Sequence, residues 1–295
     1  MKYTTPGHWQ RLHVTFTNSS DTTLYVFFMT PNGTDSYINN IQVEEKNHPT
    51  PYTESSRTAS TIQDVSGFGN NGTINGTLQA GETPIHYKTS MLFNASPYVS
   101  CGKGAKVTDA FTVNWWGKMS NWSNYTRAIS CTEGGGWNFE PGGSGSAYMN
   151  FACGTGTSSN TYHSAPSKTT LAALGSGWHM FTGTYDGFNA KIYIDGKLEY
   201  TKAAYSTKTP AFYNKSNAIF VGAEAAGSAT SPDSLRFNGS LSDIRIYATA
   251  LSEEDIMNLY NNPVSIGDTG SLFAYSIEET GINNTSFDAT GTVSA

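Results

Sequence analysis

Carboxylate and amide side chains gather in a glycine-rich stretch that begins at Asp64. The run DVSGFGNNGT continues through Asn70, Asn71 and Gly72, and its three glycines and two asparagines tolerate repeated turns with positive φ. An irregular backbone of this kind lets side-chain and carbonyl oxygens converge, and these are the ligands that Ca²⁺ prefers. We therefore expect a structural calcium ion here. The alternative is that Asp64 only hydrogen-bonds its own turn.

Aromatic and hydrogen-bonding side chains also gather between Asn121 and Ser176, where the strand pattern is weak. A sugar ring stacks on an exposed aromatic ring while amide or guanidinium groups bond its hydroxyls, and loops on a rigid scaffold often carry such sites. The candidate sugar-binding residues are Trp122, Tyr125, Arg127, Trp137, Asn138, Tyr148 and Tyr162. The alternative is that these rings cap the edges of a β-sandwich.

The acidic residues form no recognisable catalytic pair. Glycoside hydrolysis needs two carboxyl groups that face each other across a cleft, and no strand-like run carries alternating acids. Glu133, Glu140 and Glu224 lie among glycines and alanines, which is typical of solvated turns. No G-x-S-x-G nucleophile motif is present, and the six histidines lack a paired motif. The sequence therefore predicts no enzyme.

Charge and composition exclude two other classes of partner. The net charge is −6 and the 17 Lys and Arg residues are scattered, whereas nucleic-acid binding needs clustered cations. No apolar run approaches the length of a membrane span, and the first residues lack the apolar core of a signal peptide. The cysteines, Cys101, Cys131 and Cys153, are too few for a disulfide framework. We expect free thiols, with a Cys131–Cys153 bridge as the alternative.

A β-meander from Trp178 to Tyr200 is the clearest local prediction. Apolar residues alternate in WHMFTGTY, and a turn at Asp186 and Gly187 leads to a second run, KIYI. The dipeptide Asp195-Gly196 then favours a tight second turn. Bulky residues lie on both faces of the first run, which predicts a central strand that is covered on both sides.

The sequence also predicts two further strands, with the side chains on each face, and one helix. Phe111 to Met119 alternates strongly and places Trp115 on a core face. In the run from Phe237 to Tyr247, strict alternation places Leu241, Asp243, Arg245 and Tyr247 opposite Ser242, Ile244 and Ile246. Ser252 is a suitable N-cap for a short helix with three acids in its first turn.

These runs also resemble a known family. WHMFTGTYDG followed by KIYIDGK is similar to the central hairpins of laminin-G-like, concanavalin A-like jelly-roll domains, and DVSGFGNNGT is similar to their opening motif. The run FNGSLSDIRIYATALSEEDIMNLY resembles their closing signature. The resemblance implies an all-β jelly-roll sandwich with one short C-terminal helix. It also implies that calcium bridges the Asp64 loop to Asp243, unless Asp243 pairs with Arg245.

Three parts follow from this organisation. Residues 1–56 contain WQRLHVTF, YINNIQVEE and HPTPYT, which together resemble the closing third of a carbohydrate-binding β-sandwich common in phage tail proteins. Residues 57–262 are the laminin-G-like domain, preceded by a stiff Pro-containing linker. Residues 263–295 are a C-terminal extension that begins a further segment.

The combined expectation is a non-catalytic adhesion module in a phage tail or another virion surface protein, located in the virion or outside the cell. Its expected partners are a cell-surface glycan or polysaccharide and other segments of the parent tail protein. Neither nucleic-acid binding nor membrane insertion is expected. One alternative is a glycoside hydrolase or polysaccharide lyase of concanavalin A-like fold, and another is a purely structural virion spacer.

Overall fold

A computed structural model describes residues 61–62, 64, 68–80, 90–107, 109–119, 126–132, 135–142, 147–154, 162–203, 207–211, 218–224, 232–233, 235–261, 271–275, 286–287 and 293–294. The chain separates into two compact units, Met1–Ser56 and Arg57–Ala295, and every described residue lies in the second. The sandwich fragment expected in residues 1–56 therefore lies outside the described residues.

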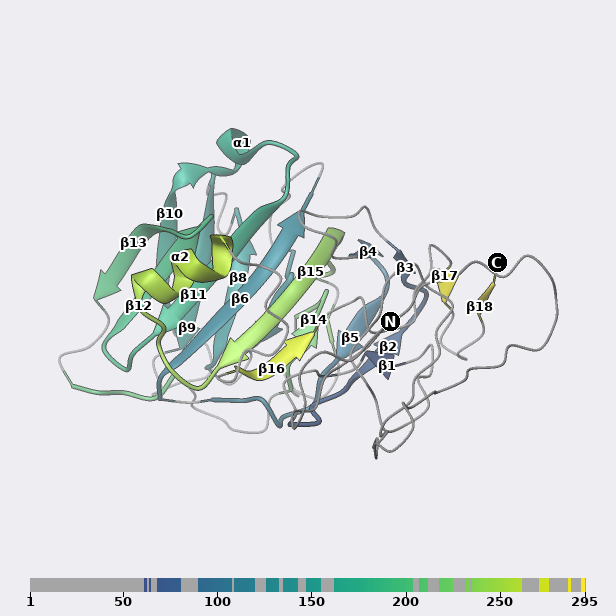
Figure 1. Cartoon of the computed structure of the whole chain (residues 1–295), viewed down its shortest axis with the longest axis horizontal. Coiled ribbons are helices and arrows are strands. Elements are labelled where there is room, and N and C mark those ends of the chain that lie inside the picture. Colours follow the sequence, from purple (N-terminus) through teal and green to yellow (C-terminus); the bar gives the residue numbers. More distant parts are fainter. Residues whose placement is uncertain are drawn as a thin grey trace, which may run out of the picture. The chain divides into compact units, whose positions relative to one another are not determined.

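The described residues form two antiparallel sheets (Figure 1). Sheet A has the order β1-β2-β5-β14-β7-β8-β9-β10. Its strands are β1 (Thr61–Ile62), β2 (Gly72–Asn75), β5 (Tyr98–Ser100), β14 (Phe220–Val221), β7 (Ile129–Cys131), β8 (Trp137–Pro141), β9 (Tyr148–Gly154) and β10 (Tyr162–Thr170).

Sheet B has the order β13-β12-β11-β6-β15-β4-β3-β17-β18, and β16 pairs with β15 beside this path. Its strands are β13 (Lys197–Ala203), β12 (Asn189–Ile194), β11 (His179–Tyr185), β6 (Phe111–Lys118), β15 (Asn238–Tyr247), β4 (Met91–Asn94), β3 (Gln79–Ala80), β16 (Ser271–Tyr275), β17 (Ser286–Phe287) and β18 (Val293–Ser294). The expected all-β jelly-roll sandwich is thus confirmed.

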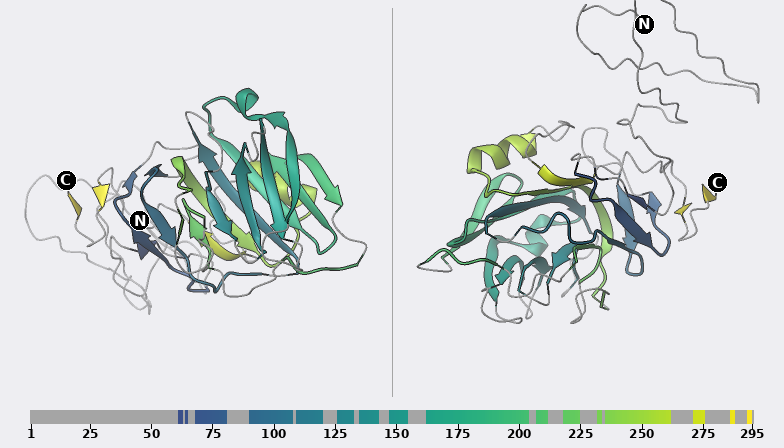
Figure 2. Two further views of the ribbon diagram at one scale, coloured as in Figure 1. Left: turned by 180° about the vertical axis from the view of Figure 1, so that it is seen from behind. Right: turned by 90° about the horizontal axis from the view of Figure 1, so that it is seen from below.

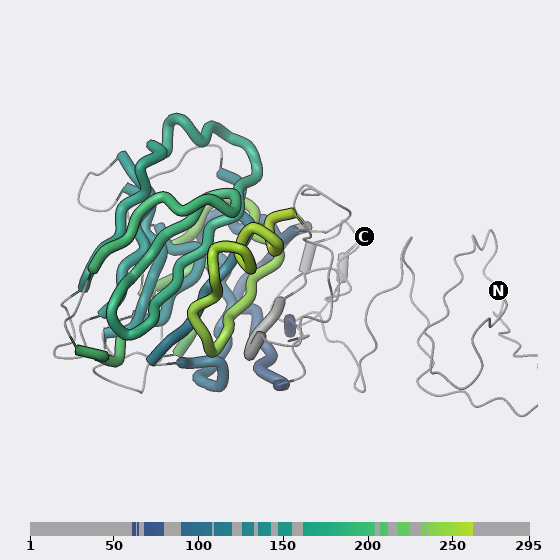
Figure 3. Tube along the Cα trace, turned by 60° about the vertical axis from the view of Figure 1, so that its left-hand side comes forward, coloured from purple at the N-terminus to yellow at the C-terminus, as the bar shows by residue number. Residues whose placement is uncertain are grey.

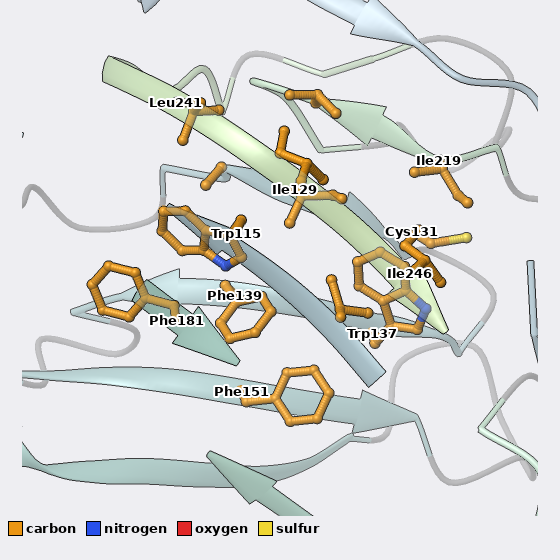
Figure 4. Close-up of a cluster of buried hydrophobic side chains, with 14 of the residues drawn as sticks. Trp115, Ile129, Cys131, Trp137, Phe139, Phe151, Phe181, Ile219, Leu241 and Ile246 are labelled. Carbon is orange, nitrogen blue, oxygen red and sulfur yellow. The ribbon is translucent and has the colours of Figure 1, made fainter. Parts of the chain in front are cut away.

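The main core fills the space between the two sheets (Figure 4). Trp115 of β6 stacks on Phe181 of β11 with ring centroids 4.5 Å apart, and it meets Phe139 of β8 edge-on at 5.5 Å. Gly183 of β11 lies so close to the Phe151 ring that a Cβ there would collide with it. The inner faces of both sheets therefore interdigitate through aromatic rings, as in other aligned sandwiches.

A second apolar layer covers the outer face of sheet B, where the helix α2 (Glu253–Asn261) lies (Figure 2). Met180 and Trp116 point from the sheet toward Ile256 of the helix, and Trp116 stacks on Tyr260 with centroids 5.7 Å apart. Strand β11 thus buries one set of side chains in the main core and the other beneath α2. The prediction of a central strand covered on both sides is confirmed.

The predicted meander is present as β11, β12 and β13. Its second turn has positive φ at Asp195 (51°) and Gly196 (80°), which is the conformation that an Asp-Gly dipeptide favours. Gly196 faces Met257 and Tyr260, so α2 packs on this turn, and the tube view shows the helix beside the meander (Figure 3). A residue with a side chain would crowd the helix here.

Both helices in the described residues begin at side-chain caps. Ser252 Oγ accepts a hydrogen bond from the Asp255 backbone N–H, and Asp255 Oδ2 accepts one from the Ser252 N–H, which confirms Ser252 as the N-cap of α2. The short helix α1 (Leu171–Leu174) was not expected. Thr170 Oγ1 caps it by accepting from the Ala173 N–H.

Strand β15 departs from the strict alternation that the sequence suggests. Its pairing with β6 shifts between Ser242 and Arg245, and Asp243 has a φ of 45°. This β-bulge adds one residue, so Leu241 and Ile244 both face the main core although they are three residues apart. The predicted sidedness of β15 is therefore wrong beyond Asp243.

The three cysteines are free and buried, as the sequence indicated. In sheet A, Trp137 pairs with Cys131 on one side and Cys153 on the other, so the two cysteines lie two strand spacings apart. That separation is about 9–10 Å, beyond the reach of a disulfide bond. The alternative of a Cys131–Cys153 bridge is therefore wrong. Burial also raises the pKa of the Cys131 thiol to about 12.

Candidate functional site

The outer face of sheet A, the face turned away from the main core, collects polar side chains from β7 and β8. In β8 the rings of Trp137 and Phe139 lie in the core, so the alternating residues Asn138 and Glu140 face outward. Ser130 of β7 pairs directly with Asn138 and is also outward. Two neighbouring strands thus present amide, carboxylate and hydroxyl groups on one surface.

Arg127 links two acidic residues on this face. Its Nε donates to Oε1 of Glu224 at 3.2 Å, and its Nη2 lies 3.5 Å from Oε2 of Glu140. The same Glu224 oxygen accepts hydrogen bonds from Thr132 Oγ1 at 3.1 Å and Asn138 Nδ2 at 3.4 Å. Because Arg127 and Glu224 are each only 5% exposed, this charged network is part of the folded framework.

Strand β9 extends the polar surface toward solvent. Asn150 pairs with Glu140 across the two strands, and Tyr148 stands two residues earlier on the same face. Tyr148 is 37% exposed, whereas Asn150 is buried. We call the set Tyr148, Asn150, Glu140, Arg127, Glu224 and Asn138 the outer-face strip. It combines an exposed aromatic ring with amide, carboxylate and guanidinium groups.

A second aromatic cluster lies further along the same sheet. Tyr98 of β5 and Phe220 of β14 have ring centroids 6.0 Å apart, and the Arg236 guanidinium carbon lies 4.7 Å from the centroid of the Tyr98 ring. Arg236 also forms an isolated parallel bridge with Arg127. Cation–π contact therefore fixes one basic side chain beside the outer-face strip.

The structure brings together three of the seven residues that the sequence suggested for sugar binding, namely Arg127, Asn138 and Tyr148. Tyr162 begins β10, and its hydroxyl donates to the Gly135 carbonyl at 3.3 Å. Trp122 and Tyr125 lie outside the described residues.

Trp137 is a correction to the sequence-based set. It is 1% exposed and packs against Phe111 with ring centroids 6.2 Å apart, so its ring faces are occupied by the core and cannot stack on a sugar. Conversely, Glu224 was interpreted as a solvated turn residue and is in fact the buried acceptor at the centre of the network. Only its distant partners reveal that role, and no local motif marks it.

The residues of the expected calcium site have protein partners. Asp64 Oδ2 accepts from the Asn70 N–H at 2.8 Å, and Asn71 Oδ1 accepts from the Asp64 N–H at 2.9 Å, while Gly72 begins β2. Asp243 forms a two-pronged pair with Arg245, at 2.8 Å to Nε and 3.1 Å to Nη2. Burial alone would lower the pKa of Arg245, but the charge of Asp243, its hydrogen bonds to Arg245 and the contact with Tyr247 together outweigh burial and raise that pKa.

A cation that used Asp243 would therefore have to share this carboxylate with Arg245, or displace Arg245 from it. Within the described ranges, no three His, Cys, Asp or Glu side chains gather into a metal site. A calcium ion bound by Asp64, Asn70, Asn71, Gly72 and Asp243 stays a prediction.

The two packed sheets and the helix on the outer face of sheet B define a jelly-roll module of the lectin type. A family model described as the concanavalin A-like lectin/glucanases superfamily, Laminin_G_3, matches residues 93–257. This match spans more than half of the chain, and the protein belongs to that superfamily.

Solved structures with similar folds include binding domains of toxins and one domain of an extracellular enzyme. Domain 4 of AbnA, an extracellular arabinanase from Geobacillus stearothermophilus, was solved with arabinotriose; it aligns at 17% identity with a TM-score of 0.53, covering 70% of this chain and all of that domain. The binding domain of Paraclostridial Mosquitocidal Protein 1 aligns at 13% identity with a TM-score of 0.54, covering 71% of this chain and 53% of that one.

The binding domain of Botulinum Neurotoxin DC, solved in complex with SialylT, aligns at 19% identity with a TM-score of 0.51 and covers 69% of this chain. This chain spans about half the length of the toxin binding domains, 53% and 51%. At these identities the likeness establishes the fold. A search of curated protein sequences finds no match. In the part of the chain that the structure describes, no helix is long and apolar enough to cross a membrane.

Proposed function

We propose that the laminin-G-like domain of residues 57–262 is a non-catalytic adhesion module that binds host-surface glycans through the outer-face strip. The observation that carries this proposal is the exposed ring of Tyr148 beside Asn150 and Glu140. An exposed aromatic ring offers an apolar surface to a sugar face, and the neighbouring Glu140 carboxylate, which is partly exposed, can bond its hydroxyls. The Arg127 network holds the Glu140 carboxylate in place.

Proteins of similar fold support a glycan as the partner. The AbnA domain was solved with arabinotriose, and a botulinum neurotoxin binding domain was solved with SialylT. Botulinum neurotoxin type C also has a structure of similar fold, and its cell entry is dependent upon interaction with two ganglioside molecules. These proteins share only their fold with the present chain. Carbohydrate binding by this chain is therefore our proposal.

We further propose a virion setting, in a phage tail protein whose other segments contact this chain. This rests on the resemblance of residues 1–56 to a sandwich fragment common in tail proteins, together with the adhesive type of the following domain. Mass spectrometry of purified tailed-phage particles tests the setting: peptides of this chain are expected at stoichiometric amounts in the particles. Their absence from every particle that encodes the chain would exclude it.

The binding proposal is tested by comparing two tyrosines. Tyr148 and Tyr200 are 37% and 38% exposed, but Tyr148 lies on the outer-face strip and Tyr200 lies on the edge strand β13 of sheet B. A glycan array first identifies a ligand, and calorimetry then measures its affinity. We expect Tyr148→Ala to weaken binding by about tenfold, as truncation of an aromatic anchor does. Tyr200→Ala should leave the affinity unchanged.

The outcomes separate the alternatives. If the two substitutions change the glycan affinity equally, the binding site does not lie on the outer-face strip. A folded protein that binds no glycan on the array would favour the purely structural virion spacer.

A glycoside hydrolase or polysaccharide lyase is the second candidate, because the structure gathers two carboxylates, Glu140 and Glu224, around Arg127. Against it, Oε1 of Glu224 already accepts three hydrogen bonds from protein groups. Incubation with mixed glycans checks for turnover. Product formation that Glu140→Gln or Glu224→Gln abolishes would establish the enzyme, whereas we expect no product.

A further inference from the structure

One edge of β15 is divided between two strands. Along its first edge β15 pairs with β6 over most of its length. On the opposite edge, β4 pairs with Asn238–Leu241, and β16 pairs with Ile244–Tyr247 (Figure 1). The bulge at Asp243 separates these two halves. The second half of this edge, Ile244–Tyr247, therefore pairs with a strand of its own, independently of β4.

This half-edge lies in the interior of the sheet. The side chains of Ile244, Arg245, Ile246 and Tyr247 are all buried, so both faces of this part of β15 are covered. Without a strand beside them, the backbone N–H and C=O groups that point from these residues toward β16 would lose their hydrogen-bond partners. Unpaired buried backbone groups are costly, and an open edge attracts another strand.

The strand that fills the half-edge comes from outside the matched family domain. The family model covers residues 93–257, whereas β16 begins at Ser271, after the nine residues 262–270 that follow α2. Pairing of an added strand depends mainly on main-chain hydrogen bonds, so an identical segment of another copy makes the same bonds. The family domain thus carries an acceptor edge, and the extension carries a matching donor.

We propose that the Ile244–Tyr247 half-edge is a strand-docking site through which copies of this chain associate, with Ser271–Tyr275 of one copy paired to β15 of the next. A short tether gives the donor of the same copy an effective concentration in the millimolar range. An isolated copy therefore fills its own site, and exchange between copies occurs when they are crowded together. This inference is independent of glycan binding.

A peptide competition tests the docking site. Alternate residues of a strand donate toward one neighbour, so one of Phe273 and Ala274 donates to β15, and the double change Phe273→Pro and Ala274→Pro removes that donor. A fluorescent peptide of residues 268–278 is then added to each full-length protein. By anisotropy, we expect it to bind the double variant at least about tenfold more tightly than the wild type, whose site is filled. The matched control is the same peptide with both prolines.

Wild-type protein alone provides a second test that does not depend on the folding of a variant. Sedimentation analysis from micromolar to millimolar concentration should reveal dimers or larger species that free 268–278 peptide reduces and the proline peptide does not. A double variant that takes up no peptide, or a wild type that stays monomeric across the range, overturns the proposal. Far-UV circular dichroism verifies that the variant retains its β-sheet content.

Discussion

The indole of Trp137 shows how one position separates a core role from a binding role. Its neighbours along β8, Asn138 and Glu140, face outward, while Trp137 is 1% exposed and packs against Phe111. Alternation along a strand makes these two roles mutually exclusive at successive residues. Successive residues of β8 therefore face opposite sides of sheet A, and only those on the outer side can contact a ligand.

We expect Trp137→Ala to lower the free energy of unfolding by about 3–5 kcal/mol, because a buried tryptophan leaves a large cavity when it is truncated. Urea denaturation measures the change. The contrast is Tyr148→Ala, which removes an exposed ring and should cost less than about 1 kcal/mol. A Trp137→Ala protein that keeps its stability but loses glycan affinity would return Trp137 to the binding surface.

Residue chemistry in the sequence suggested Arg127, Asn138 and Tyr148 as sugar-binding residues, which stays a prediction, and the structure places all three on the outer face of sheet A. The same residue chemistry missed Glu224. The acid lies in an alanine-rich stretch after β14, and its partners Arg127, Thr132 and Asn138 are 86–97 residues away in sequence. The neighbouring residues in the sequence indicate a solvated turn at this position. Only the pairing of distant strands makes the carboxylate a buried acceptor.

At the scale of elements, the first meander strand begins with a histidine that is held at both ring nitrogens. His179 Nδ1 lies 2.8 Å from Asp195 Oδ2, and Nε2 lies 2.8 Å from the carbonyl oxygen of Leu174. Both partners are acceptors, so the ring satisfies them together only as an imidazolium. The hydrogen bond to Asp195 raises the pKa of His179 above its ordinary value of 6.5, against the opposing effect of burial.

This geometry predicts a pH dependence of stability with a definite sign. Because the folded-state pKa of His179 is raised, its stabilising contribution is complete below pH 6.5 and is lost as the pH rises through the folded-state pKa. We expect the melting temperature of the wild type to exceed that of His179→Gln most at acidic pH, with the gap narrowing at alkaline pH. Thermal unfolding from about pH 5 to pH 9 measures it.

His163 is the matched control, since burial and the charge of Lys202 lower its pKa and its contribution has the opposite sign. Its stabilising effect is present above pH 6.5 and is lost as the pH falls through the lowered value. A gap between wild type and His179→Gln that stays constant over the whole range contradicts the imidazolium at position 179.

Element prediction succeeded where alternation is uninterrupted and failed where the backbone inserts a residue. The meander turns at Asp195-Gly196 as expected, because that dipeptide accepts positive φ at both positions. In β15, by contrast, positive φ falls on Asp243 in the middle of an alternating run. Aspartate tolerates this conformation, but an aspartate in a strand does not by itself indicate a bulge. Strict alternation therefore assigned the residues after Asp243 to the wrong faces of the sheet.

At the scale of the whole molecule, contacts between the two sheets close the sandwich at one edge. Glu199 of β13 accepts hydrogen bonds from the backbone N–H groups of Lys168 and Thr169 in β10, at 2.8 and 2.7 Å. Strands β10 and β13 are the end strands of sheets A and B. A single carboxylate thus joins the two sheets and protects the edge strand β13 from further pairing.

The predicted calcium ion would join two distant segments of the chain. The opening loop around Asp64 and the closing strand around Asp243 are far apart in sequence, and an ion bound to both would restrain the whole domain. Binding to the folded state alone adds stability in proportion to the logarithm of ligand concentration. At a calcium concentration roughly 100-fold above the dissociation constant, we expect a rise in melting temperature of about 5 °C or more, reversed by EDTA.

The ligand roles are separable from general stability by comparing the size of this rise among variants. Asp243→Asn retains a residue that tolerates positive φ, but it weakens the pair with Arg245 and lowers stability without any ion. Asp64→Asn alters the opening loop and leaves Arg245 paired. If calcium bridges the two, each variant loses the calcium-dependent rise whatever its starting stability. A wild type that shows no rise would mean that the Asn70 and Arg245 contacts hold these carboxylates without an ion.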